Sequence, residues 1–350
     1  MLRFCIAVVA IGTAAAVNAQ TPLSYPDYRA AVGAYRKGDV NGAAALLANR
    51  SPDSLKRAAR LLVEENNDWR LVAAAAMLHT ELVILGRVVS KPDVSLHMRL
   101  ALDAIDSERL PFRPPGRDRA QELDAFRERW YSLAASVFLA STDPDGANQF
   151  VTRGLNSFKE SGRLRLLAGE VSELRAHILY ADLHDRAIIT VMRPSQARQF
   201  LVGAASEYQA ALAQDPSLAE AQLRLGRTQA LLNHVEPARA ALQAAASHGE
   251  PRVTYLARLF LGALASYQRD YQAARQEYQA ALEIMPSCQT PYIALAYVER
   301  LTGHDAAVAE LFERFASWQS SPLEADPWWA YQNGGLDEDS LAWLREKVME

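Results

Sequence analysis

Histidines and carboxylates are the residues of this chain most able to hold a metal or transfer protons, provided that their spacing brings them together. His177 and His184 are seven residues apart. On a helix they share a face but stand ~10 Å apart along the axis, whereas zinc needs bonds near ~2 Å. His79 and Glu81 are two apart and point to different faces. His97 could approach His79 in the fold, where we expect structural or solvated histidines. We predict no metal site and no cofactor.

Nucleophile motifs are absent from the sequence, which contains no G-x-S-x-G and no phosphate-cradling glycine loop. Glu160-Ser161 needs a separate test, because lytic transglycosylases combine an exported helical superhelix with a catalytic Glu-Ser. The glycine-rich segment that follows in that family is missing, and "KESGRLRLLAG" is typical of a loop between helices. We therefore predict no enzyme and no catalytic residues. The alternative is a glycan-acting cell-envelope enzyme, which requires two buried carboxylates with raised pKa beside a pocket.

Composition and the N-terminus indicate an exported protein. The 350 residues are 50% hydrophobic and 22% charged, with a formal net charge of −4, which favours a soluble globular chain and no nucleic-acid partner. Arg3 precedes an uncharged stretch from Phe4 to Ala16, and Val17-Asn18-Ala19 is typical of a signal-peptidase site. We expect cleavage near Ala19, a periplasmic or secreted location, and no membrane span after cleavage. A retained anchor and a lipoprotein are the disfavoured alternatives.

Disulfides are not expected to stabilise the mature chain. Of the two cysteines, Cys5 lies in the predicted signal peptide, so only Cys288 remains. Stability must then come from packing.

Residue periodicity predicts helices throughout and a repeat in the second half. Ala, Leu, Arg, Glu and Gln recur at three- and four-residue spacing, and alternating β-branched runs are nearly absent. Small and large residues also recur in columns with a period near 34, which is the tetratricopeptide period. Small residues let two helices approach, large ones fill the adjoining hole, and the prolines are expected to stop the second helix of each pair. The columns are Ala204, Ala238, Ala274 and Val308; Tyr208, Leu242, Tyr278 and Phe312; Ala211, Ala245, Ala281 and Phe315; and Pro216, Pro251 and Pro286.

The stretch "LARLFLGALASYQRDYQAARQEYQAALEIMP" resembles the tetratricopeptide family through Leu261, Gly262, Ala274, Tyr278, Ala281 and Pro286. "AEAQLRLGRTQALLNHVEPARAALQAA" is similar, but it has Asn233 in place of the turn glycine. "YIALAYVERLTGHDAAVAELFERF" keeps Gly303 and Phe312 but has Val308 where alanine is expected. "DPWWAYQ" resembles the closing stretch of exported bacterial tetratricopeptide proteins with no assigned activity.

The first half is less regular. "YRAAVGAYRKGDVNGAAALLA" and "RWYSLAASVFLASTDPDGANQFVTRGL" each match one helix pair, and "DWRLVAAAAMLHTELVIL" predicts a helix buried on more than one side. Two loops, "ERLPFRPPGRDRA" and "HDRAIITVMRPSQ", interrupt the array. The last helix carries acidic residues near its start and an apolar stripe, Leu341, Leu344 and Val348, which favours a cap on the end of the stack.

The resemblance implies an all-α fold, a right-handed α-α superhelix of tetratricopeptide-like pairs with a C-terminal capping helix. We divide the chain into a signal peptide (1–19), an irregular tetratricopeptide-like region (20–190), a regular array (191–318), and an aromatic segment with the capping helix (319–350).

Alignment with the family implies a concave groove that binds a protein or peptide through apolar pockets and arginines. The predicted groove residues are Arg224, Arg227, Leu256, Leu259, Tyr267, Ile293, Tyr297 and Arg300. A second cluster, Trp328, Trp329 and Tyr331, is either an exposed binding platform or, as we favour, tucked under the final helix. A further alternative is a structural subunit whose inserted loops fill its own groove.

Overall fold

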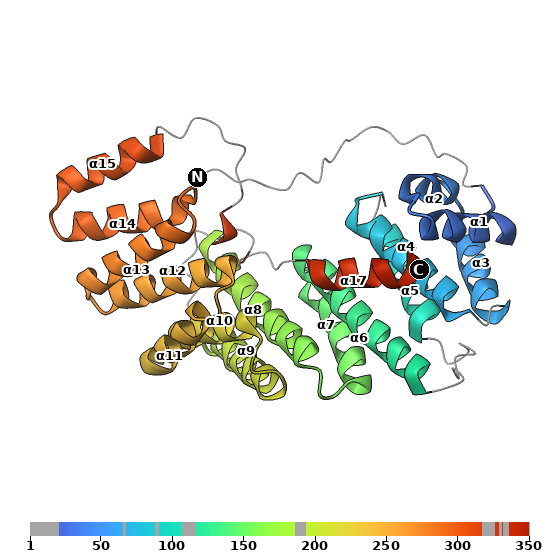
Figure 1. The fold of residues 1–350 in the computed structure, drawn as a ribbon, viewed down its shortest axis with the longest axis horizontal. Helices are drawn as coiled ribbons and strands as arrows, with labels where there is room; N and C mark the ends of the chain where they lie inside the picture. Colours follow the sequence, from blue (N-terminus) through green and yellow to red (C-terminus); the bar gives the residue numbers. More distant parts are fainter. Residues whose placement is uncertain are drawn as a thin grey trace. The chain divides into compact units, whose positions relative to one another are not determined.

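The computed structural model of the chain is almost entirely helical (Figure 1). It describes residues 21–65, 68–87, 91–106, 117–185, 194–316, 326–328, 331 and 336–349, and side chains at all of these except 91–93, 106, 117–120, 178–185, 194 and 315–316. These residues form 16 helices and no strand. The predicted signal peptide, both inserted loops for the most part, Trp329, and the side chains of His184 and Phe315 lie outside this description.

The first of two compact units comprises residues 1–120 and 343–350. As predicted, the alanine-rich helix α4 is buried on several sides, because each residue from Val72 to Leu82 is inaccessible. The first predicted pair is also confirmed, with Tyr28, Tyr35 and Ala43 fully buried. The helices are α1 (Tyr25–Arg36), α2 (Val40–Leu47), α3 (Pro52–Glu65), α4 (Trp69–Ile84) and α5 (Lys91–Asp106).

The second unit, residues 121–342, contains most of α6 and the whole of α7–α15. Its later helices pack as successive antiparallel pairs, α8 with α9, α10 with α11, α12 with α13 and α14 with α15, in the manner of a tetratricopeptide-like solenoid. The helices are α6 (Arg117–Ala140), α7 (Pro144–Ser157), α8 (Gly162–Asp185), α9 (Pro194–Gln214), α10 (Ala219–Leu231), α11 (Val235–Ala246), α12 (Pro251–Tyr267), α13 (Tyr271–Ile284), α14 (Gln289–Leu301) and α15 (Asp305–Ala316).

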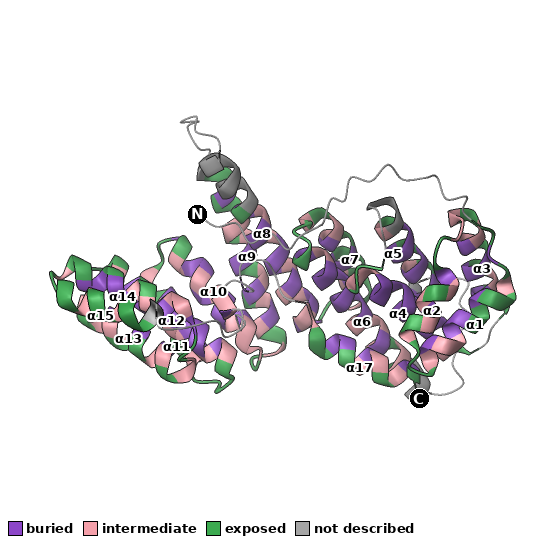
Figure 2. Cartoon of the chain, turned by 90° about the horizontal axis from the view of Figure 1, so that it is seen from above, coloured by how far each residue is buried: buried purple, intermediate pink, exposed green. Residues whose placement is uncertain are grey.

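The predicted columns form the interfaces of this array. The small and large positions of α9, α11 and α13 are all buried, and in Figure 2 buried and exposed residues alternate around each helix. Phe312, the large residue of α15, departs from this pattern, because its side chain is 55% exposed. The fully or nearly buried column members are Ala204, Tyr208, Ala211, Ala238, Leu242, Ala245, Ala274, Tyr278 and Ala281.

Turns between the helices follow the family pattern even where the residue differs. Asn233, Arg269 and Gly303 occupy matching positions and all have positive φ, at 64°, 64° and 80°. Asparagine tolerates the left-handed region better than most residues, so the replacement of glycine at 233 leaves the turn intact. One expectation was wrong: Pro251 does not stop a helix but begins α12, a position where its missing N–H costs nothing.

The C-terminal helix α17 (Glu338–Met349) has the predicted apolar stripe, with Leu341, Leu344 and Val348 buried. Its placement differs from the prediction. Asp337, just before the helix, pairs with Arg163 of α8 at 3.1 Å, and its N–H donates to Ser136 Oγ of α6 at 2.9 Å. In the second unit α17 therefore starts beside α6 and α8 rather than on α15. Among the described residues, no helix is long and apolar enough to cross a membrane.

Candidate binding face and the segment that covers it

Glycines show which side of each first helix is free of its partner helix. A Cβ on Gly226 of α10 would lie 2.6 Å from Leu242 of α11, and one on Gly262 of α12 would lie 2.5 Å from Tyr278 of α13. Arg224 and Phe260 each precede these glycines by two residues, which places them about 160° away around the helix. Arg224 and Phe260 therefore point away from the partner helices, toward the predicted groove.

A segment from the far end of the second unit occupies this side of the array. We call Asp326, Pro327, Trp328 and Tyr331 the covering segment, and the residues beneath it, Glu173, Arg224, Arg227, Leu256 and Phe260, the covered face. Tyr331 is 2% exposed and belongs to the same buried cluster as Leu256 and Phe260, against which Trp328 also packs.

Aromatic rings hold the segment in place. The Tyr331 ring centroid lies 5.3 Å from that of Phe260, and the guanidinium carbons of Arg224 and Arg227 lie 4.4 Å and 5.0 Å from it. Trp328 meets Phe260 edge-on at 5.5 Å, with the Arg227 guanidinium 5.5 Å from its ring. Such stacked cations are attracted to the electron-rich ring faces.

Asp326 holds the start of the segment through hydrogen bonds. It is 4% exposed and accepts from Tyr255 Oη at 2.8 Å and from the backbone N–H of Thr290 at 2.8 Å. Thr290 lies in the first turn of α14, whose N-cap residue Cys288 offers no side-chain cap. Asp326 therefore supplies, from another part of the chain, the acceptor and the negative charge that a helix N-terminus favours.

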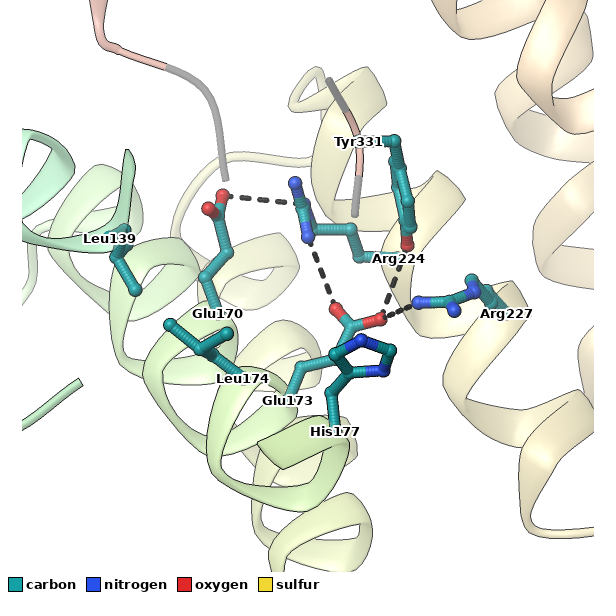
Figure 3. A pocket seen from close by; sticks show the side chains of 8 residues that line it. All are labelled: Leu139, Glu170, Glu173, Leu174, His177, Arg224, Arg227 and Tyr331. Atoms are coloured by element: carbon teal, nitrogen blue, oxygen red, sulfur yellow. Dashed lines mark hydrogen bonds and ion pairs between the residues drawn. The ribbon is translucent and has the colours of Figure 1, made fainter. Parts of the chain in front are cut away.

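A buried charged cluster lies under Tyr331 (Figure 3). Glu173 of α8 accepts hydrogen bonds from Tyr208 Oη at 2.7 Å, from Arg224 Nη1 at 3.1 Å and from Arg227, and Tyr331 Oη lies 3.4 Å away. Every acceptor position on this carboxylate is thus supplied with donors, which a buried charge requires.

Arg224 is shared between three carboxylates. Besides Glu173 it meets Glu170 at 3.3 Å and Glu220 at 2.7 Å, and Arg252 pairs with Glu220 at 2.5 Å. Burial alone would lower the pKa of Arg224, but the carboxylates around it hold that pKa above its usual value. The guanidinium stays charged.

The two buried glutamates of α8 have opposite pKa shifts. Burial raises the pKa of Glu170 to about 7, although Arg224 opposes the shift. Burial would also raise the pKa of Glu173, but Arg227, Arg224 and the Tyr208 hydroxyl outweigh it and lower that pKa. The difference follows from partners, because Glu173 accepts hydrogen bonds from two arginines, whereas Arg224 and Arg252 only partly offset the burial of Glu170 and the charges of Glu220 and Glu173.

A small cavity lies beside this cluster and encloses about 30 Å³. That volume holds about two water molecules, not a sugar or a peptide. Its walls come from α6, α8, α10 and the covering segment: Leu139, Glu170, Glu173, Leu174, His177, Arg224, Arg227 and Tyr331.

The predicted groove residues divide into a covered and an open set. Arg224, Leu256 and Leu259 are at most 5% exposed and Arg227 is mostly buried, so no partner can reach Leu256 or Leu259 in this state. Their participation in binding remains a prediction. The open set is Tyr267, Ile293, Tyr297 and Arg300, all exposed.

The two described members of the predicted aromatic cluster, Trp328 and Tyr331, pack against the array and do not form an exposed platform. The two rings stack with centroids 6.2 Å apart. Their ring and hydrogen-bond partners lie on α8, α10 and α12, and Trp328 also packs against a cluster formed by α12, α13 and α14. The expectation that they lie under the final helix was therefore wrong in its location. Contacts between residues this far apart in the chain leave few recognisable patterns in the sequence.

The other candidate residues have structural roles in the described regions. His79 Nδ1 meets His97 Nδ1 at 2.7 Å, as the expected approach of the two histidines implied, and His79 Nε2 is 2.7 Å from Tyr28 Oη. Glu81 pairs with Arg345 at 2.7 Å. Ser161 Oγ accepts from the N–H of Leu164 at 3.1 Å and so caps α8, while Glu160 is exposed. No group of three metal-ligating side chains occurs among the residues described.

Sequence reasoning did not identify Glu170, Glu173 and Asp326. Two glutamates three apart within "LLAGEVSELRA" would lie on one side of a helix among leucines and alanines, which is a detectable signal for buried charge. Nothing local marks Asp326 as the partner of Tyr255 or Thr290, because these contacts span 71 and 36 residues.

No protein-family model matches this chain, and no curated protein matches it. Among solved structures it is similar to PilW, a type IV pilus biogenesis factor, at 14% identity over 73% of this chain and 98% of that one, with a TM-score of 0.45. MamA is 18% identical over 56% of this chain and 98% of its own, with a TM-score of 0.41. Human IFIT1, solved as a dimer with PPP-AAAA, is 14% identical over 80% of this chain and 73% of its own, with a TM-score of 0.39. The solenoid fold of this chain is established by its own helix pairs and repeated interface columns.

Proposed function

We propose that this protein is an exported helical-repeat scaffold that binds another protein through the open end of its array. The observation that carries the proposal is an exposed apolar stripe on α14. Ile293, Tyr297 and Leu301 are 55%, 53% and 45% exposed and follow one another at four-residue intervals on one helix face. Exposed aromatic and aliphatic residues gathered in this way are typical of protein-binding surfaces.

Neighbouring residues extend the same end of the array. Tyr267 at the end of α12 is 72% exposed and Phe312 of α15 is 55% exposed, while Arg300 lies next to Leu301 on α14. A partner with an apolar surface and acidic groups fits this composition. Packed helix pairs present the surface already formed, which lowers the ordering cost of binding.

The enzyme alternative receives less support. It required two buried carboxylates with raised pKa beside a pocket, whereas only the pKa of Glu170 is raised and that of Glu173 is lowered. The cavity beside them has room for about two waters.

Affinity capture from a cell-envelope extract tests the proposal. The bait is the mature chain, compared with Ile293→Asp and Tyr297→Ala. Val202→Asp is the matched control, because Val202 is 51% exposed on α9 and lies outside the stripe. We expect one partner to be retained by the wild type and the control and lost from both stripe variants. Equal capture by all four baits would contradict the proposed surface.

Export is tested separately by intact-mass measurement of the protein recovered from expressing bacteria. We expect a chain starting at Gln20 in the periplasmic or secreted fraction. A chain that keeps Met1 and remains in the cytoplasm would contradict export.

A further inference from the structure

The covering segment presents a short and specific set of chemical groups. Asp326 provides one carboxylate, Trp328 an aromatic ring two residues later, and Tyr331 a second ring with a hydroxyl three residues after that. Each group has its own partners on the array: the donors of Tyr255 and Thr290, the ring of Phe260, and the arginines of α10. This arrangement is how a groove binds a peptide, with a charge fixing the register and pockets taking the rings.

The covered face does not need the segment for its charge balance. Glu173 keeps Tyr208, Arg224 and Arg227 as donors without Tyr331, whose hydroxyl is the most distant of the four at 3.4 Å. Arg224 likewise keeps Glu170 and Glu220. Removing the segment would therefore leave two oriented, paired guanidiniums and an apolar floor at Leu256 and Phe260. Such a surface is ready to receive another aromatic segment.

We propose that the covered face is a receptor site for a protein segment with the chemistry Asp-x-Trp-x-x-Tyr, and that Asp326, Trp328 and Tyr331 are its intramolecular occupant, which a partner's segment displaces. This inference rests on the proposed binding function and gives it a second surface with a defined ligand. The partner segment is an acidic peptide with two aromatic residues downstream of its carboxylate.

An intramolecular occupant masks the site by mass action. Tethered segments commonly have effective concentrations near the millimolar range, so a free peptide with micromolar affinity would face competition of about 10³-fold. Weakening the tethered copy should then raise the apparent affinity for a free copy, without any change in the receptor residues.

The test uses a fluorescein-labelled synthetic peptide with the sequence of residues 322–335, and measures fluorescence anisotropy on titration with the full mature chain. The wild type is compared with a triple variant, Asp326→Asn, Trp328→Ala and Tyr331→Ala, and with Asp326→Asn alone. We expect the triple variant to bind the peptide at least about 10-fold more tightly than the wild type, with Asp326→Asn intermediate. A folded triple variant that binds no more tightly would overturn the proposal.

Two controls define where the peptide binds. A labelled peptide with Asp326→Asn should bind the triple variant at least about 10-fold more weakly, because it lacks the charge that accepts from Thr290 and Tyr255. Adding Arg227→Ala to the triple variant should weaken binding, whereas adding Val202→Asp should not. If the peptide binds equally well to all of these, it binds elsewhere and the receptor assignment is wrong.

Folding of the variants is checked by circular dichroism and thermal unfolding. If the triple variant does not fold, the single variant Asp326→Asn provides the test, because it keeps the shape of the segment. No gain in peptide affinity for this single variant would contradict displacement. The outcome is independent of the α14 stripe, because the peptide probe needs no partner from an extract. Failure of capture and failure of peptide exchange can therefore be told apart.

Discussion

Leu259 and Ile293 occupy equivalent positions in consecutive repeats, 34 residues apart, yet Leu259 is 5% exposed and Ile293 is 55% exposed. The local helices are alike, so the difference comes from outside the repeat. Leu259 belongs to a buried cluster that includes Leu295 and Val298 of the next repeat and that Trp328 packs against, whereas Ile293, in the last helix pair of the array, is left open to solvent. The repeat thus sets which way a residue points, and the next repeat together with Trp328 determines whether a partner can reach it.

Arg224 and Phe260 are a second pair of equivalent positions whose environment depends on the covering segment. They are 36 residues apart in matching positions, and both contact Tyr331. One contact is a stacked cation and the other an edge-to-face ring pair. A single tyrosine therefore joins the charged part of the covered face to the apolar part, which neither position indicates alone.

The largest expected effect comes from removing the carboxylate at the centre of the covered face. Glu173→Ala leaves Arg224 and Arg227 with fewer charge partners and two tyrosine hydroxyls without an acceptor, so we expect a loss of about 3–5 kcal/mol in the free energy of unfolding. Glu277→Ala breaks the partly exposed pair with Arg258 and should cost less than about 1 kcal/mol. Urea unfolding measures both. Similar losses in the free energy of unfolding for the two variants would contradict the difference between the covered and open regions.

Truncation of the matched pair of apolar residues should give the next largest contrast. Leu259→Ala creates a cavity in the buried cluster that Trp328 packs against and should cost about 2–5 kcal/mol. Ile293→Ala removes an exposed side chain and should change stability by no more than about 0.5 kcal/mol. The two variants are compared by urea unfolding under identical conditions, and a cost at Ile293 equal to that at Leu259 would show that the open stripe is buried.

The raised pKa of Glu170 gives the covered face a dependence on pH. Because the pKa of Glu170 is about 7 in the folded chain, against an ordinary value of 4.5 for a glutamate, the folded state holds its proton more tightly. The resulting penalty is absent below pH 4.5, grows between 4.5 and 7, and is complete above 7. Glu170→Gln should therefore stabilise the protein relative to wild type at pH 8 more than at pH 5. Melting temperatures at the two pH values provide the measurement, and a difference of opposite sign would contradict the assignment.

The smallest expected effects separate two of the tyrosine hydroxyls that donate to carboxylates, those of Tyr255 and Tyr331. Tyr255→Phe removes a 2.8 Å donor from buried Asp326 and should cost about 1.5–3 kcal/mol. Tyr331→Phe removes a 3.4 Å contact from a carboxylate with three other donors and should cost less than about 1 kcal/mol. Thermal unfolding of the two variants tests the order. The reverse order would mean that Tyr331, not Asp326, anchors the segment.

Much of the fold could be predicted from the sequence, because interfaces between adjacent helices depend on residues at fixed short spacing. Ala274 and Tyr278 show this, and Asn233 replaces a turn glycine without changing the turn. The covered site could not be predicted in the same way. Tyr331 meets Glu173 across 158 residues, and no local pattern encodes that distance. Family alignment pointed to Arg224 and Arg227, whose role in binding a partner stays a prediction, but could not indicate that the chain's own Tyr331 covers them.

Thiol accessibility tests the central claim most directly. In a chain whose own Cys5 and Cys288 are replaced by serine, Leu256→Cys and Ile293→Cys are reacted with a colorimetric disulfide reagent under native conditions. We predict that Ile293→Cys reacts rapidly, that Leu256→Cys, in the same buried cluster as Tyr331, is protected, and that adding Trp328→Ala and Tyr331→Ala removes the protection. Equal, rapid reaction at both positions in the otherwise unchanged chain would contradict a covered face.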